Sequence, residues 1–333
     1  MVETRLSFKY VAKRAAVSIF IIWALLTLLF LLLKAMPGDI ADILLNPQLD
    51  QESIEALRRR YGLNQPLWKQ YLRWVFNYAT FDFGYSLNST DKVVTIIAIR
   101  LPRTLVLFGT AFLLQYTVGI IAGIHFGWNR GTKTDKGGFL TGLTLYSVPF
   151  FWIGWMLLLV FAHGQFAFDV LPLGHMTTAF QSEFSALNLV TDVMYHLVLP
   201  AGSLLIVGWA GAMLVMRTSM QEVVDAPYIE TARAKGLPPS VVKYKHGARN
   251  ALIPVATQAI IGIAFIIDGS VIVETVFSWP GIGALLVSAI LERNFPVALA
   301  AFFFLGVLVV VMRFLTDVAY TFLDPRIKFG ESS

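Results

Sequence analysis

The chain alternates long apolar runs with shorter polar segments that hold most of its charged residues. An uncharged apolar run of about 18 residues or more is long enough for a helix to cross a bilayer. Four runs reach this length, and two more are interrupted by Asp268 and by Arg313. The pattern predicts an all-α polytopic membrane protein with six transmembrane helices, at residues 15–36, 104–126, 139–162, 196–216, 251–273 and 297–323.

The first apolar run follows a basic start, as the core of a cleaved signal peptide would. Such a core has about 7–15 residues, whereas this run is longer and is followed by Lys34-Ala-Met-Pro-Gly, a poor cleavage site. We therefore expect the run to be retained as a membrane helix.

Lys and Arg are concentrated in alternate segments between the predicted spans. The positive-inside rule then makes four segments cytoplasmic, namely 1–14, 127–138, 217–250 and 324–333. The extracytoplasmic segments are 37–103, 163–195 and 274–296. Segment 37–103 is basic but long enough to be translocated regardless of its charge. Both termini are therefore predicted to lie in the cytoplasm of a multi-pass cell-membrane protein.

Segment 37–103 has the pattern of a small folded insertion. Residues 50–60 have acidic residues first and basic residues last, which suits a helix dipole. Apolar side chains then recur at helical spacing, at Trp68, Tyr71, Leu72, Trp74, Val75 and Tyr78. We expect these side chains at the membrane interface, with stacking on a ligand as the alternative.

The sequence lacks the usual combinations of catalytic residues. It has no cysteine, no HExxH motif and no Gly-Lys dipeptide, so it has no Walker loop, and its five histidines are scattered singly. The net charge is +5, but the basic residues form no aromatic-interleaved face for nucleic acid. We therefore expect a protein that is not an enzyme and that holds no metal or cofactor of its own.

A polar island interrupts the apolar pattern within segment 217–250. Pro227 near the start and Gly236 as a stop predict a short helix over 226–236, and Pro238-Pro239 can open a second one. The small side chains of this helix, Thr231, Ala232 and Ala234, would let it sit in a groove of a partner, with Glu230 and Arg233 at the rim. An ordinary basic loop that only anchors the topology is the alternative, and composition favours neither.

Several motifs give the chain a specific resemblance. The island motifs "ETARAKG" and "HGARNALIP" resemble the coupling loop of binding-protein-dependent ABC importer permeases. The chain is most similar to the oligopeptide/dipeptide family, in particular to the first of its two permease subunits. The other matching motifs follow in order: "MPGD", "YGLNQPLWKQYLRW" with "FDFGYSL", "RLPRTLVL", "SVPFFWIG", "VETVFSWPGIG" and "DPRIKFG".

The resemblance implies a type I importer permease architecture with an extracytoplasmic insertion after the first helix. It also implies several partners in the lipid bilayer and beside it: a homologous second permease subunit, two cytoplasmic ATPases that bind ATP and Mg, and an extracytoplasmic solute-binding protein. The solute would be a peptide, an oligosaccharide or a chelated metal.

In the family, the coupling helix fits a groove on an ATPase. The matching positions here are Tyr228, Glu230, Thr231, Ala232, Arg233, Ala234, Lys235 and Gly236. Two features depart from the broader importer pattern. Thr231 replaces an alanine, and Pro238-Pro239 replaces a more polar pair.

Polar groups inside the predicted spans are candidates for the solute pathway. Asp268 could meet a cationic or hydroxylated solute or could bond a partner subunit. Gln115 and Gln258 could line the pathway, but we favour hydrogen bonds between helices. Pro149 is a further pathway candidate, because it should kink the third span, and such a kink could widen a cavity or serve packing alone. Arg313 and Asp317, four residues apart, could pair with each other.

Glycines mark two further features of the spans. Gly119, Gly123 and Gly127 recur every four residues, which permits close packing of helices. Residues 279–283, Trp-Pro-Gly-Ile-Gly, indicate a re-entrant or surface turn on the outer side.

One other class of transporter fits the bulk pattern. An ion-coupled carrier or channel subunit would also have many apolar helices, but it would not need a helix-stop-helix island on the cytoplasmic side.

Overall fold

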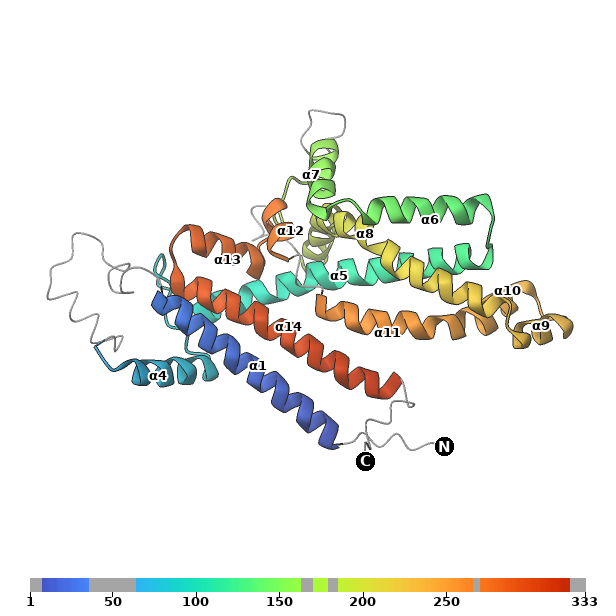
Figure 1. Cartoon of the computed structure of the whole chain (residues 1–333). Helices are drawn as coiled ribbons and strands as arrows, with labels where there is room; N and C mark the ends of the chain where they lie inside the picture. Colours follow the sequence, from blue (N-terminus) through green and yellow to red (C-terminus); the bar gives the residue numbers. More distant parts are fainter. Residues whose placement is uncertain (1–7, 36–63, 163–169, 179–184, 266–269, 324–333) are drawn as a thin grey trace.

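The computed structural model describes residues 8–35, 64–162, 170–178, 185–265 and 270–323, and its regular elements in those ranges are helices (Figure 1). Asp268, residues 50–60 and the C-terminal tail from residue 324 lie outside the described residues. The helices of the first half of the chain are α1 (Phe8–Ala35), α4 (Leu67–Ala79), α5 (Val93–Trp128), α6 (Lys133–Tyr146) and α7 (Phe150–Phe161).

The second half begins with the long helix α8 (Ala186–Val224). Three short segments and a longer helix follow: α9 (Pro227–Ala234), α10 (Pro239–Val241), the π-helix η2 (Val242–Ala248) and α11 (Arg249–Phe265). The chain then forms α12 (Ser270–Val276), α13 (Ile282–Leu291) and α14 (Phe295–Leu323).

Among the described residues, four helices are long and apolar enough to cross a membrane: α1, α5, α8 and α14. The pair α6 and α7 would add a fifth if the two form one broken span. The predicted span 251–273 corresponds to α11 and α12, between which residues 266–269 are not described. Helices α5 and α8 extend beyond the predicted spans 104–126 and 196–216 at both ends, because a charge-free run marks the apolar part of a helix and not its ends.

The predicted span 139–162 is two helices and not one kinked helix. Helices α6 and α7 meet at an angle of 97°. Proline lacks an N–H donor and disfavours helical geometry in the residue before it, so a helix tends to end ahead of it. Accordingly, α6 ends at Tyr146, and Pro149 is the N-cap of α7.

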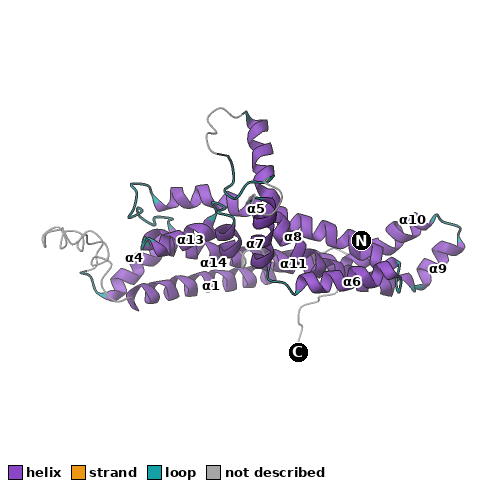
Figure 2. Ribbon diagram, turned by 90° about the horizontal axis from the view of Figure 1, so that it is seen from above, coloured by secondary structure: helices purple, strands orange, loops and turns teal. Residues whose placement is uncertain are grey.

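The long helices run side by side, and the bundle has two distinct ends (Figures 1 and 2). Helices α9 and α10 lie at one end, whereas α4 and α13 lie at the other, in both views. The α9–α10 end and the α4–α13 end are therefore separated by the length of the bundle.

Helices α5 and α8 pack with almost no space between their backbones. A Cβ atom added at Gly119 would lie 2.6 Å from the carbonyl oxygen of Trp209, and one added at Gly127 would lie 2.6 Å from that of Arg217. Gly123 is equally close to α8. The predicted close packing at these three glycines is confirmed.

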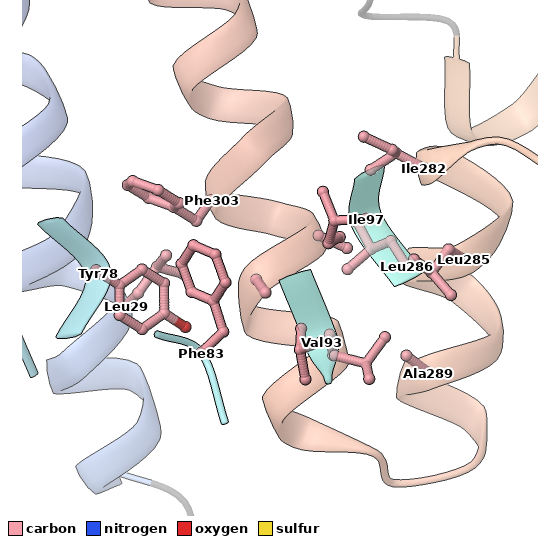
Figure 3. Close-up of a cluster of buried hydrophobic side chains, with 14 of the residues drawn as sticks. Leu29, Tyr78, Phe83, Val93, Ile97, Ile282, Leu285, Leu286, Ala289 and Phe303 are labelled. Atoms are coloured by element: carbon pink, nitrogen blue, oxygen red, sulfur yellow. The ribbon is translucent and has the colours of Figure 1, made fainter. Parts of the chain in front are cut away.

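A hydrophobic cluster at the α4–α13 end joins five helices (Figure 3). Tyr78 of α4 and Phe83 of the following loop pack there with Phe303 of α14. On the same face of α4, the Trp74 indole N–H donates to the carbonyl of Leu26 at 3.2 Å. The aromatic pattern of α4 therefore has two parts, because Trp68 and Leu72 are exposed while Trp74 and Tyr78 pack inward.

The turn between α12 and α13 is buried, which excludes the predicted surface turn. Trp279 has no exposed area, and its indole N–H donates to the carbonyl of Arg103 at 2.9 Å. Glu274 is also fully buried and accepts hydrogen bonds from the Thr104 hydroxyl at 2.6 Å and the Ala284 N–H at 3.0 Å. These bonds attach α13 to α5.

Candidate functional site

Helix α9 begins and ends where its sequence dictates. Pro227 is its first residue, a position where the missing N–H costs nothing. At the other end Gly236 has a φ of +72°, its N–H donates to the carbonyl of Arg233 at 2.9 Å, and the Leu237 N–H donates to that of Ala232 at 3.4 Å. This pair of bonds is a Schellman motif, which terminates a helix at a left-handed glycine. The predicted helix and its stop are therefore present.

The helix has one buried face. Ile229 is 0% exposed and Ala232 is 4% exposed, and both pack with Val242 of η2. Leu237, just beyond the Schellman motif, joins the same cluster. Ala232 therefore faces the body of its own chain, which corrects its assignment to the surface offered to a partner.

The other candidate coupling residues are exposed and form what we call the α9 surface: Tyr228, Glu230, Thr231, Arg233, Ala234, Lys235 and Gly236. The guanidinium of Arg233 lies 5.5 Å from the centre of the Trp128 ring at the end of α5. Such a cation–π contact restrains a long side chain without burying its charge. The α9 surface thus combines small residues with both signs of charge on a fixed base.

Both ends of α9 are joined to longer helices that fall in the predicted spans. Val224, the last residue of α8, is only three residues from Pro227. On the other side Pro238 caps α10, which continues through η2 into α11, so the proline pair does open a second helix. The π-helix buries Gly247 against Trp128 and Met220. A displacement of α9 would therefore act on α8 and α11 directly.

The candidate pathway glutamines flank α8. The Gln115 amide N–H donates to the carbonyl of Leu204 at 2.9 Å, so it bonds α5 to α8 as we favoured. Among the described residues, the buried Oε1 atom of Gln258 has no hydrogen-bond partner. Its Nε2 atom would lie 3.8 Å from a Cβ added at Gly211. Pro149 lies at the break between α6 and α7.

Asp317 forms an ion pair that its own helix does not reveal. The spacing in the sequence predicts a pair with Arg313 of the same helix. In the structure, the carboxylate of Asp317 lies 3.3 Å from the guanidinium of Arg14 in α1. The two residues are about 300 positions apart in the sequence, so only the folded chain brings them together. In the described helices and turns, no group of three or more His, Asp or Glu residues is arranged to hold a metal ion.

Comparison with known families covers nearly the whole chain. Residues 115–329 match the family "Binding-protein-dependent transport system inner membrane component", and residues 7–108 match the N-terminal family of the same membrane components. These matches do not support the ion-coupled carrier that the bulk pattern left open.

Individual relatives extend over the same range. The chain is 36% identical to the oligopeptide transport system permease protein AppB of Bacillus subtilis, over 96% of this chain and 99% of the relative. It is 33% identical to the di/tripeptide transport system permease protein DppB of Pseudomonas aeruginosa, over 96% and 98%. A putative peptide permease protein of Brucella ovis is 35% identical over 96% and 99%.

Proposed function

The chain belongs to the family of binding-protein-dependent transport system inner membrane components, and from this premise we propose that it is one of two permease subunits of an ATP-driven peptide importer. Relatives that match over nearly their whole length are named for oligopeptides and for di- and tripeptides. Peptides are therefore the proposed solute class, with oligosaccharides as a related possibility. A homologous second permease completes the pathway across the bilayer.

In this proposal the α9 surface contacts a cytoplasmic ATPase. The observation that carries the assignment is a helix with a fully buried base, a defined stop and an exposed face of small and charged residues. ATP and Mg²⁺ bind to the ATPase subunits, because this chain has no phosphate-cradling loop. Closure of the ATPases moves α9, and the attached helices α8 and α11 carry that movement into the membrane.

The proposal also fixes the sides of the membrane. Both termini and α9 face the cytoplasm, as the distribution of Lys and Arg predicts. The segment 37–103, which contains α4, faces the opposite side together with α13. An extracytoplasmic solute-binding protein therefore delivers the solute on the side of α4 and α13.

A proline substitution at the end of α9 tests the assignment. Proline cannot adopt the φ of +72° found at Gly236, and Gly236→Pro also removes the N–H that bonds Arg233. We expect solute-stimulated ATP hydrolysis by the purified complex to fall about tenfold or more, because the coupling between distant sites is lost. The measurement is the rate of ATP hydrolysis with and without the loaded solute-binding protein.

Gly84 provides a matched control at the opposite end of the bundle. It has a φ of +77°, so Gly84→Pro imposes the same backbone conflict far from α9. We expect this variant to keep its stimulation by solute in whatever complex assembles. Full stimulation in an assembled Gly236→Pro complex would show that α9 is not the coupling element.

A further inference from the structure

An ion pair with a buried carboxylate links α6 and α8 near α9; the side chain of its arginine, Arg217, is 19% exposed. The guanidinium of Arg217 in α8 donates two hydrogen bonds to Asp135 near the start of α6, from Nε to Oδ1 at 2.6 Å and from Nη2 to Oδ2 at 3.0 Å. Asp135 is 1% exposed. This two-point geometry fixes the orientation of the two side chains as well as their distance.

The turn between α5 and α6 is built around the same carboxylate. The Gly131 N–H donates to Oδ2 of Asp135 at 2.9 Å, and Gly131 has a φ of +78°. Thr132 caps α6 by accepting a hydrogen bond from the Asp135 N–H at 3.3 Å. The Arg217 guanidinium also lies 5.0 Å from the ring centre of Phe139. The pair therefore holds the whole turn between α5 and α6 against α8.

Arg217 lies close to the start of the coupling helix. It is seven residues before Val224, where α8 ends, and the α5 backbone at Gly127 packs against its carbonyl. Arg233 of α9 contacts Trp128, the last residue of α5. The ends of α5 and α8, the start of α6 and all of α9 thus form one connected unit.

We propose that Asp135 and Arg217 are positioning residues that make α6 follow the movements of α9. The proposal rests on the function proposed above. Separating the pair would leave the buried carboxylate of Asp135 without its countercharge, so the pair stays together when α8 moves. Displacement of α9 by an ATPase then shifts α6, and the break at Pro149 passes this shift to α7 at a new angle. Without the pair, the start of α6 would follow α8 less closely, and only packing such as that of Gly142 on Met213 would join the two helices.

A second ion pair nearby offers a matched control. Arg130 and Asp225 connect the same turn to the end of α8 at 3.5 Å, but their side chains are 64% and 74% exposed. Exposed pairs of this kind contribute little, because water and salt screen them. Asp135→Asn and Asp225→Asn thus remove the same charge from the same junction, once from a buried carboxylate and once from an exposed one.

The experiment measures solute imported per ATP hydrolysed in proteoliposomes that hold the complete transporter. We expect Asp135→Asn to lower this ratio about fivefold or more, in the range of typical coupling between sites, while ATP hydrolysis continues. Asp225→Asn should keep the ratio of the unmodified transporter. An unchanged ratio in an assembled Asp135→Asn complex would overturn the proposal.

A covalent link separates positioning from folding. The chain contains no cysteine, so the double variant Asp135→Cys/Arg217→Cys has two unique thiols in this subunit. We expect a low import ratio before treatment with a short bifunctional thiol reagent and recovery after it, because the link restores the connection without the charges. Failure of the crosslink to restore the ratio would contradict the positioning role. If no ATPase subunit copurifies with the unmodified protein, the proposed function itself is contradicted.

Discussion

Single residues carry much of the internal order at the α4–α13 end, and Glu274 is the clearest case. Its carboxylate is fully buried and accepts from Thr104 and Ala284, while the Thr104 hydroxyl accepts from the Ile282 N–H at 2.9 Å. A buried carboxylate is tolerable only when donors surround it. Glu274 therefore holds the start of α13 on α5.

Removal of this carboxylate should destabilise the subunit. Glu274→Ala leaves the Ala284 N–H and the Thr104 hydroxyl without their acceptor, at a cost of about 1–3 kcal/mol for each buried group. Thermal unfolding of the purified protein in detergent measures the effect. The exposed Glu292, which accepts from Asn88 at 2.8 Å, is the control, and Glu292→Ala should change the midpoint little. Equal midpoints for both variants would refute the role of Glu274.

Residue-scale features were predictable where they follow from local chemistry. Gly236 and Pro227 mark the limits of α9 in the sequence itself, because only certain residues fit a helix start or a left-handed stop. The burial of Ala232 was not predictable, since a short polar helix does not indicate which small residue faces inward. The same holds for Asp135 and Arg217, which drew no attention among the scattered charges of the cytoplasmic segments.

At the scale of elements, the pairing of α5 with α8 depends on the absence of side chains. A Cβ added at Gly127 would lie 2.5 Å from the Cβ of Met220 and 2.6 Å from the Arg217 carbonyl oxygen. A Cβ atom at Gly127 would therefore fit only if the two helices moved apart. The glycines therefore set how closely the two helices approach.

An alanine at this contact should separate the two helices. We expect Gly127→Ala to cost about 1–3 kcal/mol through overpacking. Gly109→Ala in the same helix meets no atom within 4 Å, so it should be neutral or stabilising by up to about 1 kcal/mol from helix propensity. The midpoints of thermal unfolding of the two variants test the contrast. A Gly127→Ala variant as stable as Gly109→Ala would contradict this account of the contact.

The apolar pattern predicted the existence of the elements better than their limits. Charge-free runs located the cores of α1, α5, α8 and α14, because only apolar residues suit the interior of a bilayer. They did not reveal that α8 starts ten residues before its predicted span, since helix geometry continues into polar surroundings. Pro149 indicated a disturbance, but the 97° between α6 and α7 depends on tertiary packing.

At the scale of the whole molecule, the bundle separates two kinds of surface. Helix α9 lies at one end, and α4 with α13 lies at the other (Figure 1). The long helix α5 connects these ends, because Val93 at its start lies in the cluster with α4 and α13, and Trp128 at its end contacts Arg233 of α9. The Arg14–Asp317 pair ties the first helix to the last, and no local pattern in the sequence could have indicated it. This arrangement suits the proposed role, in which an ATPase moves α9 and the attached helices transmit that movement.

The central claim is that the α9 surface contacts an ATPase. Its most direct test is site-specific crosslinking from α9 to an ATPase subunit in the assembled transporter. The chain has no cysteine, so Ala234→Cys and Ala232→Cys each place one thiol on this helix, on the exposed and on the buried face. We expect a short thiol crosslinker to join Ala234→Cys to an ATPase and to leave Ala232→Cys unlinked. An assembled complex in which Ala234→Cys forms no such link, or reacts only from the extracytoplasmic side, would contradict the account.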